Sequence, residues 1–148
     1  MGLPGSGKTT LAKVLVEKLR CTYFNADDIR KNINKDLGFS PEDRIEQARR
    51  MGHLCNLSSQ WGEVVIADLV CPTEEARQVF GADFVVWMNT ISLSRYKDTN
   101  LLFVSPKKYD YEIINFSKPT IEHVKNIQSK ALKTKYSIVG LPAKVMVK

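Results

Sequence analysis

The sequence predicts a three-layer α/β fold, in which a mostly parallel sheet carries helices on both faces. Apolar or β-prone runs alternate along the chain with amphipathic segments, which is typical of parallel strands joined by helices. Two of these runs, within 63–67 and at 84–88, are continuous apolar stretches, as strands buried on both faces are. The 148 residues are expected to form a single domain over residues 1–148.

The first ten residues carry a phosphate-binding pattern. Gly2, Gly7, Lys8 and Thr9 match G-x-x-x-x-G-K-[ST], the Walker A loop of nucleotide-binding proteins. Backbone N–H groups must wrap a triphosphate, so Gly5 and Gly7 keep Cβ atoms away and permit positive φ. The N-terminal end of a following helix is expected to face the same phosphates. The sequence therefore predicts the P-loop NTPase fold.

The side chains of this loop have separate expected roles. Lys8 is expected to bridge the β- and γ-phosphates, and the Thr9 hydroxyl is expected to ligate Mg²⁺. The sequence therefore predicts ATP and Mg²⁺ as cofactors. The residues expected to bind the nucleotide are Gly2, Pro4, Gly5, Ser6, Gly7, Lys8, Thr9 and Thr10.

A buried strand normally precedes a Walker A loop, and here only Met1 does so. The segment 143–148 alternates apolar and polar residues around Val145, Met146 and Val147. We expect this segment to fill the sheet position before the P-loop, parallel to its neighbours and with Val147 buried, as in a circular permutation. An empty position would expose the edges of both flanking strands. The alternative is a frayed tail.

The first half of the chain predicts three helices and one strand. Apolar residues at helical spacing indicate a helix over 9–19, and the β-prone run 21–24 follows it. A short helix is expected over 29–34. Ser40 before a proline, with an acid in the first turn, predicts a helix running to about Ser58.

The second half begins with the strand at 63–67 and continues with a helix over 73–80 and the strand at 84–88. A polar, basic and unpatterned stretch follows, and it is expected to be a mobile flap over about residues 92–108. The last expected elements are a short strand over 109–114 and a helix over 117–133, whose final turn is rich in lysine.

Acidic residues follow two of the predicted strands. Asp27 lies just after the run 21–24, at the sheet edge where ligands bind in open α/β folds, so it is expected to orient or deprotonate a hydroxyl acceptor. The alternative for Asp27 is a helix cap, the role expected for Asp28. Asp68 ends an apolar strand as a Walker B acid does, although ordinary strand-end polarity also explains it. The predicted metal ligands are Thr9, Asp27 and Asp68, and the predicted catalytic pair is Lys8 and Asp27.

Composition sets the broad class. The apolar fraction of 43% and charged fraction of 26% are ordinary for a globular protein, and no membrane-spanning run or signal peptide is visible, so we expect a cytoplasmic location. The net charge of +6 suits polyanionic ligands, whether small phosphorylated molecules or nucleic acid. An odd number of cysteines without metal-ligand spacing predicts reduced thiols at Cys21, Cys55 and Cys71.

Three stretches resemble the adenylylsulfate kinases: Asn-Ala-Asp-Asp-Ile-Arg at 25–30, Leu-Gly-Phe-Ser-Pro-Glu-Asp-Arg at 37–44, and Arg49-Arg50. The resemblance extends from Gly2 to about Trp87. It implies phosphorylation of the ribose 3′-hydroxyl of adenosine 5′-phosphosulfate with Mg-ATP, as part of sulfate assimilation.

The resemblance also implies roles for individual residues. The family pattern D-G-D-N-x-R puts its second Asp on Asp27 and its Arg on Arg30. The base-stacking Phe falls on Phe39, the substrate-binding Arg on Arg44, and a family Asn on Gln47.

Two regions depart from the family pattern. The family's Ser-x-x-Ser-Pro reads Asp-Leu-Val-Cys-Pro at 68–72, and its lid signatures are replaced by Arg-Tyr-Lys-Asp at 95–98 and Phe-Val-Ser-Pro at 103–106. Arg95 and Lys97 are the lid cations that could close over phosphates, and the alternative, favoured for any single one of them, is solvated surface charge.

Three alternatives remain open at this stage. Asp-Asp-Ile-Arg after a strand is also similar to polynucleotide kinases, so the acceptor can be a polynucleotide 5′-hydroxyl. Nucleic acid is less favoured, because the sequence has no basic stripe interleaved with aromatic residues. The second alternative is a nucleotide-binding module without catalysis, and the third is a fragment or rearranged chain with poor turnover. The expected partner is a small nucleotide, no membrane is involved, and a homodimer is compatible with the sequence.

Overall fold

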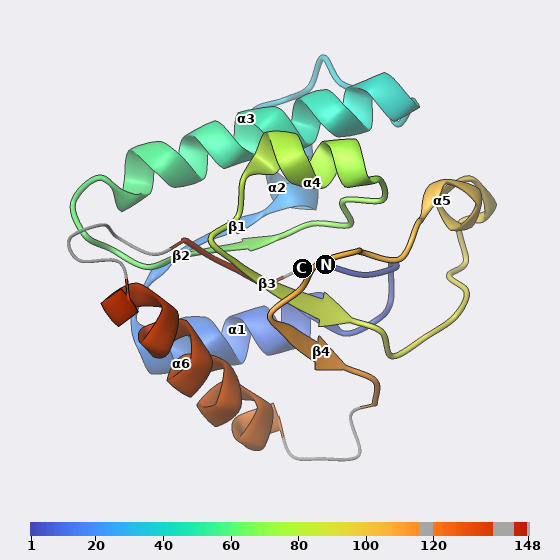
Figure 1. The fold of residues 1–148 in the computed structure, drawn as a ribbon. Coiled ribbons are helices and arrows are strands. Elements are labelled where there is room, and N and C mark those ends of the chain that lie inside the picture. Colours follow the sequence, from blue (N-terminus) through green and yellow to red (C-terminus); the bar gives the residue numbers. More distant parts are fainter. Residues whose placement is uncertain (116–119, 138–143, 148) are drawn as a thin grey trace.

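A parallel sheet forms the centre of the protein, and helices cover both of its faces (Figure 1). The computed structural model describes residues 1–115, 120–137 and 144–147, with side chains for 1–115 and 120–131. Within these residues the sheet has five strands in the order β1-β2-β5-β3-β4, all paired in parallel. The strands are β1 (Thr22–Asn25), β2 (Val65–Asp68), β3 (Phe84–Met88), β4 (Tyr111–Ile113) and β5 (Lys144–Val147). The predicted three-layer α/β fold is confirmed.

Two helical layers bury the apolar residues of the strands. The helices are α1 (Lys8–Leu19), α2 (Ala26–Asn32), α3 (Pro41–Ser59), α4 (Glu74–Phe80), α5 (Lys97–Leu102) and α6 (Thr120–Ser137). In Figure 1, α1 and α6 lie below the sheet, and α3 and α4 lie above it. Successive residues of a strand point to opposite faces, so Ile66 packs with the α1 and α6 core, whereas Val65 and Ala67 pack with α3 and α4.

The strand β5 lies between β2 and β3. Val145 pairs with Ile66 of β2 and with Phe84 of β3, and both pairings are parallel. Met1 lies against the same edge of β3, because its ammonium group donates to the carbonyl oxygen of Val86 and its carbonyl oxygen accepts from the N–H of Met88. Val147, the last residue of β5, pairs with Val86, whose carbonyl oxygen accepts from the Met1 ammonium group. The position of residues 144–147 agrees with the strand expected over 143–148; the burial of Val147 lies outside the described side chains.

The helix α2 begins earlier than the sequence indicated, and its cap is a different residue. The side chain of Asn25 accepts hydrogen bonds from the N–H groups of Asp27 (3.0 Å) and Asp28 (3.1 Å). The capping role expected for Asp28 was therefore wrong. Asn25 ends β1 in an extended conformation, which is the backbone geometry that an N-cap residue needs.

The flap contains a helix that the sequence did not predict. Asn100 closes the turn before α5, because its Oδ1 accepts from the N–H of Ser94 and its Nδ2 donates to the Ser94 carbonyl, both at 2.9 Å. The sequence indicated no helix within the flap, whereas the structure has α5 at Lys97–Leu102; the mobility expected of the flap stays a prediction. The helix has no apolar periodicity to reveal it, since Leu101 is 88% exposed. The last predicted helix matches α6 from Thr120 onward, and 117–119 lie outside the described residues.

The contact between α3 and α4 depends on a glycine. A Cβ atom on Gly52 would collide with the carbonyl oxygen of Phe80 and would lie 3.0 Å from its Cα. Both obstacles are backbone atoms of α4, so the helices must separate to admit it. Glycine is here the residue that lets two helices approach closely.

We expect Gly52→Ala to lower the free energy of unfolding by about 1–3 kcal/mol. In a helix interior, alanine is normally more stabilising than glycine by roughly 0.5–1 kcal/mol. At this position the cost of overpacking exceeds that gain. Chemical denaturation measures the change. The control is Asn56→Ala, on an exposed position of the same helix, which is expected to stay within about 0.5 kcal/mol of the parent. An unchanged or raised stability of Gly52→Ala would contradict the packing argument.

Two further sequence predictions concern thiols and membranes. None of the three cysteines, all in the described part of the chain, forms a disulfide; Cys55 and Cys71 are buried and Cys21 is half-buried. Among the described parts of the chain, no helix combines the length and the apolar character needed to cross a bilayer.

Candidate active site

The P-loop turns sharply into α1 at the carboxyl end of the sheet. Gly7 is the residue before α1 and has φ 90°, a left-handed conformation that favours glycine. Because no side chain caps α1, its first N–H groups are available to hydrogen-bond a ligand. Gly2 has a different reason to be glycine, since a Cβ there would collide with the carbonyl oxygen of Met88.

Lys8 is buried at the start of α1, with 8% of its surface exposed. Its Nζ donates to the carbonyl oxygen of Leu3, 2.9 Å away within the same loop. Burial lowers the pKa of Lys8 from its ordinary value, and the nearby carboxylates of Asp68 and Asp27 oppose that shift. An anionic phosphate beside Lys8 would raise its pKa, as these carboxylates do, and would so favour the charged ammonium.

The buried carboxylate of Asp68 is the centre of a partly buried hydrogen-bond network. Asp68 is 2% exposed, and its Oδ2 accepts from Thr9 Oγ1 at 2.6 Å, from Asn25 Nδ2 at 3.1 Å and from Tyr23 OH at 3.2 Å. These donors come from α1 and from β1, the strand next to β2.

The network suits a magnesium ion. The Thr9 hydroxyl donates a hydrogen bond to Asp68. The lone pairs of the Thr9 oxygen are therefore able to face a cation. The buried carboxylate supplies negative charge beside that hydroxyl, and oxygen ligands are what Mg²⁺ prefers. Thr9 and Asp68 therefore fit the predicted metal site, while Asp27 lies nearby as an exposed residue of the first turn of α2.

The loop between α2 and α3 presents an aromatic ring flanked by two cations. Phe39 is 63% exposed. The guanidinium carbon of Arg30 lies 4.8 Å from the ring centre, and that of Arg44 lies 5.5 Å away. Arg44 also holds the backbone of this loop, because its Nε donates to the carbonyl oxygen of Phe39 at 2.9 Å. An exposed ring with cations beside it can stack on a nucleotide base and attract its charged groups.

The flap reaches this loop through Arg44. Its Nη2 donates to Asp98 Oδ2 at 2.6 Å and to Thr99 Oγ1 at 3.1 Å, and both acceptors belong to α5. The other end of the flap is held by Arg77 of α4, which donates to the carbonyl oxygens of Pro72 and Val104. The flap is thus bonded to both sides of the candidate site. No sequence signal indicated these contacts.

The side chain of Gln47, a predicted substrate-binding residue, forms hydrogen bonds within the protein. Gln47 is buried, its Nε2 donates to the carbonyl oxygen of Ala26 at 3.1 Å, and its Oε1 accepts from Asn34 Nδ2 at 2.8 Å. The Gln47 side chain therefore links α3 to Ala26, the first residue of α2, and to Asn34, in the loop after α2. Its role toward a substrate remains a prediction.

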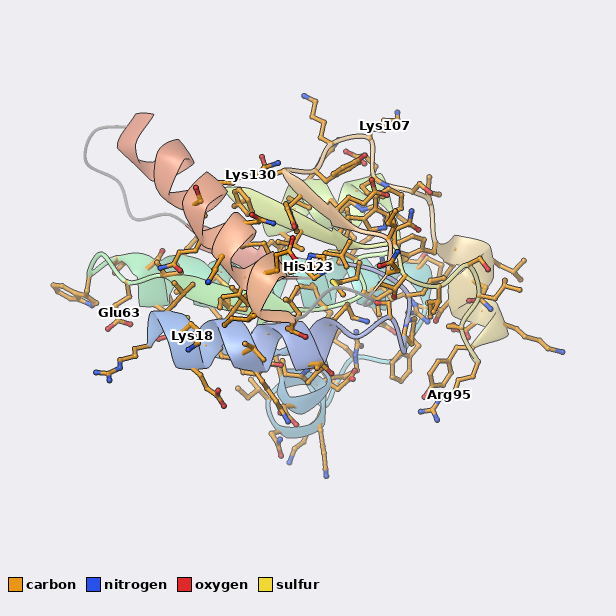
Figure 2. All side chains as sticks on the ribbon, turned by 90° about the horizontal axis from the view of Figure 1, so that it is seen from below. Lys18, Glu63, Arg95, Lys107, His123 and Lys130 are labelled. Carbon is orange, nitrogen blue, oxygen red and sulfur yellow. The ribbon has the colours of Figure 1, made fainter. Side chains whose placement is uncertain are left out.

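One cavity of about 830 Å³ brings most of the predicted residues together. Its lining includes the predicted site residues Pro4, Gly5, Lys8, Thr9, Asp27, Arg30, Phe39, Arg44, Gln47, Asp68 and Arg95. Gly2 and Ser6 are instead buried in the loop, Thr10 is exposed on α1, and Lys97 is exposed at the start of α5. Figure 2 shows Arg95 at the lower right of the view, and Lys107 at the top.

A sequence model of the family described as adenylylsulphate kinase matches residues 1–100. The chain belongs to the adenylylsulphate kinase family. Among curated members of this family, the adenylyl-sulfate kinase of Paraburkholderia xenovorans is 36% identical over 72% of this chain and 66% of its own length. The probable adenylyl-sulfate kinase of Bacillus subtilis is 42% identical over 52% of this chain and 42% of its own length. The chain thus spans about two thirds or less of these relatives.

Solved structures of adenylylsulphate kinases share the fold. The enzyme of Mycobacterium tuberculosis, solved with AMPPNP and APS, superposes with a TM-score of 0.77 at 24% identity over 88% of this chain and 93% of its own. The hexameric APS kinase of Thiobacillus denitrificans gives a TM-score of 0.65 at 20% identity over 92% of this chain and 28% of its own. A sugar kinase of Janibacter also has this fold, with a TM-score of 0.62 at 17% identity over 93% of this chain and 94% of its own. The fold is therefore compatible with more than one acceptor.

Proposed function

We propose that this protein is an ATP- and Mg²⁺-dependent phosphotransferase that phosphorylates the ribose 3′-hydroxyl of adenosine 5′-phosphosulfate. One observation carries the proposal: a single cavity is lined by the P-loop residues Lys8 and Thr9, by Asp27, and by Phe39 with its two arginines. A phosphate donor and a nucleotide acceptor can thus occupy adjoining parts of one space. Membership of the adenylylsulphate kinase family and the relative solved with AMPPNP and APS support the same assignment.

The residues divide the reaction between them. The acceptor hydroxyl attacks the γ-phosphorus, an O–P bond forms, and the bond to the ADP oxygen breaks. Asp27 orients the hydroxyl and takes its proton, while Lys8 neutralises charge on the transferred group. Thr9 and Asp68 would hold Mg²⁺, which, when bound, neutralises phosphate charge. Phe39 stacks on the acceptor base, and Arg30 and Arg44 meet its anionic groups.

The expected setting follows from the same chemistry. ATP is the proposed phosphate donor and the described cysteines form no disulfide, so we propose a cytoplasmic enzyme of sulfate assimilation acting on a small nucleotide. A homodimer is compatible with this proposal.

Steady-state ADP formation tests the acceptor directly. The panel contains adenosine 5′-phosphosulfate, adenosine 5′-phosphate, a simple sugar and an oligonucleotide with a free 5′-hydroxyl, each with Mg-ATP. We expect only the phosphosulfate to raise ADP formation well above the rate without acceptor. Turnover with the oligonucleotide alone would favour a polynucleotide 5′-hydroxyl kinase. ATP binding without turnover on any acceptor would favour a nucleotide-binding module.

We expect Phe39→Ala to weaken acceptor binding by about 1–3 kcal/mol, which is the usual cost of losing one stacked base. ATP affinity should change little, because the ring lies beside Arg30 and Arg44 rather than in the P-loop. Acceptor KM and ATP affinity, measured separately, give the two values. Phe39→Tyr keeps an aromatic ring and serves as the matched control. Equal losses for both ligands in Phe39→Ala would mean that Phe39 supports the fold instead.

A further inference from the structure

We propose that Tyr23 is a positioning residue for the magnesium site, and that it acts by fixing the carboxylate of Asp68 against Thr9. The inference rests on the proposed Mg-ATP function and adds to it a side chain that does not line the cavity. Tyr23 is half-buried in β1 and packs against the core between the sheet and the helices α1 and α6. Its phenol oxygen lies 3.2 Å from Asp68 Oδ2.

The backbone register explains why the phenol arrives there. In the pairing of β1 with β2, Tyr23 stands opposite Ile66 and Asn25 stands opposite Asp68. Residues two apart in a strand share a face, so Tyr23 and Asn25 both point to the side where Thr9 begins α1. Asn25 Nδ2 also lies 3.3 Å from the Tyr23 phenol oxygen, which links the two donors.

The three donors all bond Oδ2 of the Asp68 carboxylate, and they come from two elements, α1 and β1. Thr9 approaches Asp68 Oδ2 from the first turn of α1, Asn25 from the end of β1, and Tyr23 from within that strand. Without the phenol, the carboxylate can rotate away from Thr9, and a buried charge loses one of its hydrogen bonds. Groups that hold a metal-facing residue in this way commonly change metal affinity when they are removed.

The phenol is a donor at every working pH. Burial, with the adjacent charge of Asp68, raises the pKa of Tyr23 to about 12. The contribution of the phenol is to donate to Asp68 Oδ2 and hold that carboxylate in place, so its loss should change magnesium binding.

The test measures nucleotide binding rather than turnover. A fluorescent ATP analogue is titrated into full-length protein without Mg²⁺, and Mg²⁺ is then titrated at fixed analogue. For Tyr23→Phe we expect the half-saturating Mg²⁺ concentration to rise about 10-fold. Affinity for the analogue without Mg²⁺ should stay the same, because the ring that packs in the core is kept.

The matched control is Tyr111→Phe. This phenol lies on β4, where it contacts His123 Nδ1 at 3.1 Å. The variant Tyr111→Phe should leave both the analogue titration and the Mg²⁺ titration unchanged. An unchanged Mg²⁺ dependence in Tyr23→Phe would overturn the inference, as would an equal loss of analogue binding with and without Mg²⁺. A parent protein that binds the analogue with no effect of Mg²⁺ would instead contradict the proposed function.

A double-mutant cycle tests whether Tyr23 acts through Asp68. Asp68→Asn alone should remove most of the effect of Mg²⁺ on analogue binding, because it removes the charge and leaves an amide of similar size. Adding Tyr23→Phe to Asp68→Asn should then cause little further change. Losses that add in full would show that the two side chains act independently, and would overturn the inference.

Discussion

Lys8→Ala is expected to weaken ATP binding by about 100-fold and to abolish phosphoryl transfer, since it removes the cation that meets the β- and γ-phosphates. Lys8 is buried, and its Nζ reaches only the carbonyl oxygen of Leu3 among the hydrogen bonds found in the described residues. Removing it should therefore cost mainly ligand binding. Equilibrium binding of ATP and ADP formation with adenosine 5′-phosphosulfate measure the two effects.

Lys13→Ala is the matched control for this prediction. Lys13 is exposed on the same helix, one and a half turns further on, and does not line the cavity. It should leave both binding and turnover unchanged. Turnover by Lys8→Ala close to that of the parent would show that the P-loop lysine is not part of the reaction.

Asp27→Asn is expected to lower kcat by about 100-fold or more while leaving ATP affinity unchanged. The substitution keeps the size of the side chain and its place in the cavity, but an amide cannot take the proton of the acceptor hydroxyl. The N-terminal cap of α2 should survive, because it depends on Asn25 and the backbone N–H of Asp27. Steady-state kinetics together with ATP binding separate the chemical step from nucleotide binding.

Asp28→Asn makes the matching change one residue away. Asp28 is also exposed in the first turn of α2, but it does not line the cavity. The kcat of Asp28→Asn should therefore match that of the parent. Equal kcat values for Asp27→Asn and the parent would remove Asp27 from the mechanism. Equal losses for Asp27→Asn and Asp28→Asn would point to the charge at the helix terminus.

The sequence by itself determined the features that depend on neighbouring residues. The P-loop could be predicted because its glycines, Lys8 and Thr9 lie close together in the sequence, in one loop and the first turn of the helix that follows it. The strand at 84–88 was predicted with the bounds it has in the structure, because a continuous apolar run of that length suits only a buried element. Phe39, Arg30 and Arg44 were assigned to one site through the resemblance to the adenylylsulfate kinases, and the structure has both guanidinium groups beside the Phe39 ring.

Only the tertiary structure decided the contacts between segments far apart in the sequence. Thr9 meets Asp68 across 59 residues, Tyr23 meets it across 45, and Arg44 meets Asp98 across 54. Such pairings depend on strand order and register, which no local pattern specifies. The cap of α2 and the helix α5 were missed for a related reason. Asn25, Asp27 and Asp28 are all suitable caps until the end of β1 fixes the backbone, and α5 lacks the apolar face by which a sequence reveals a helix.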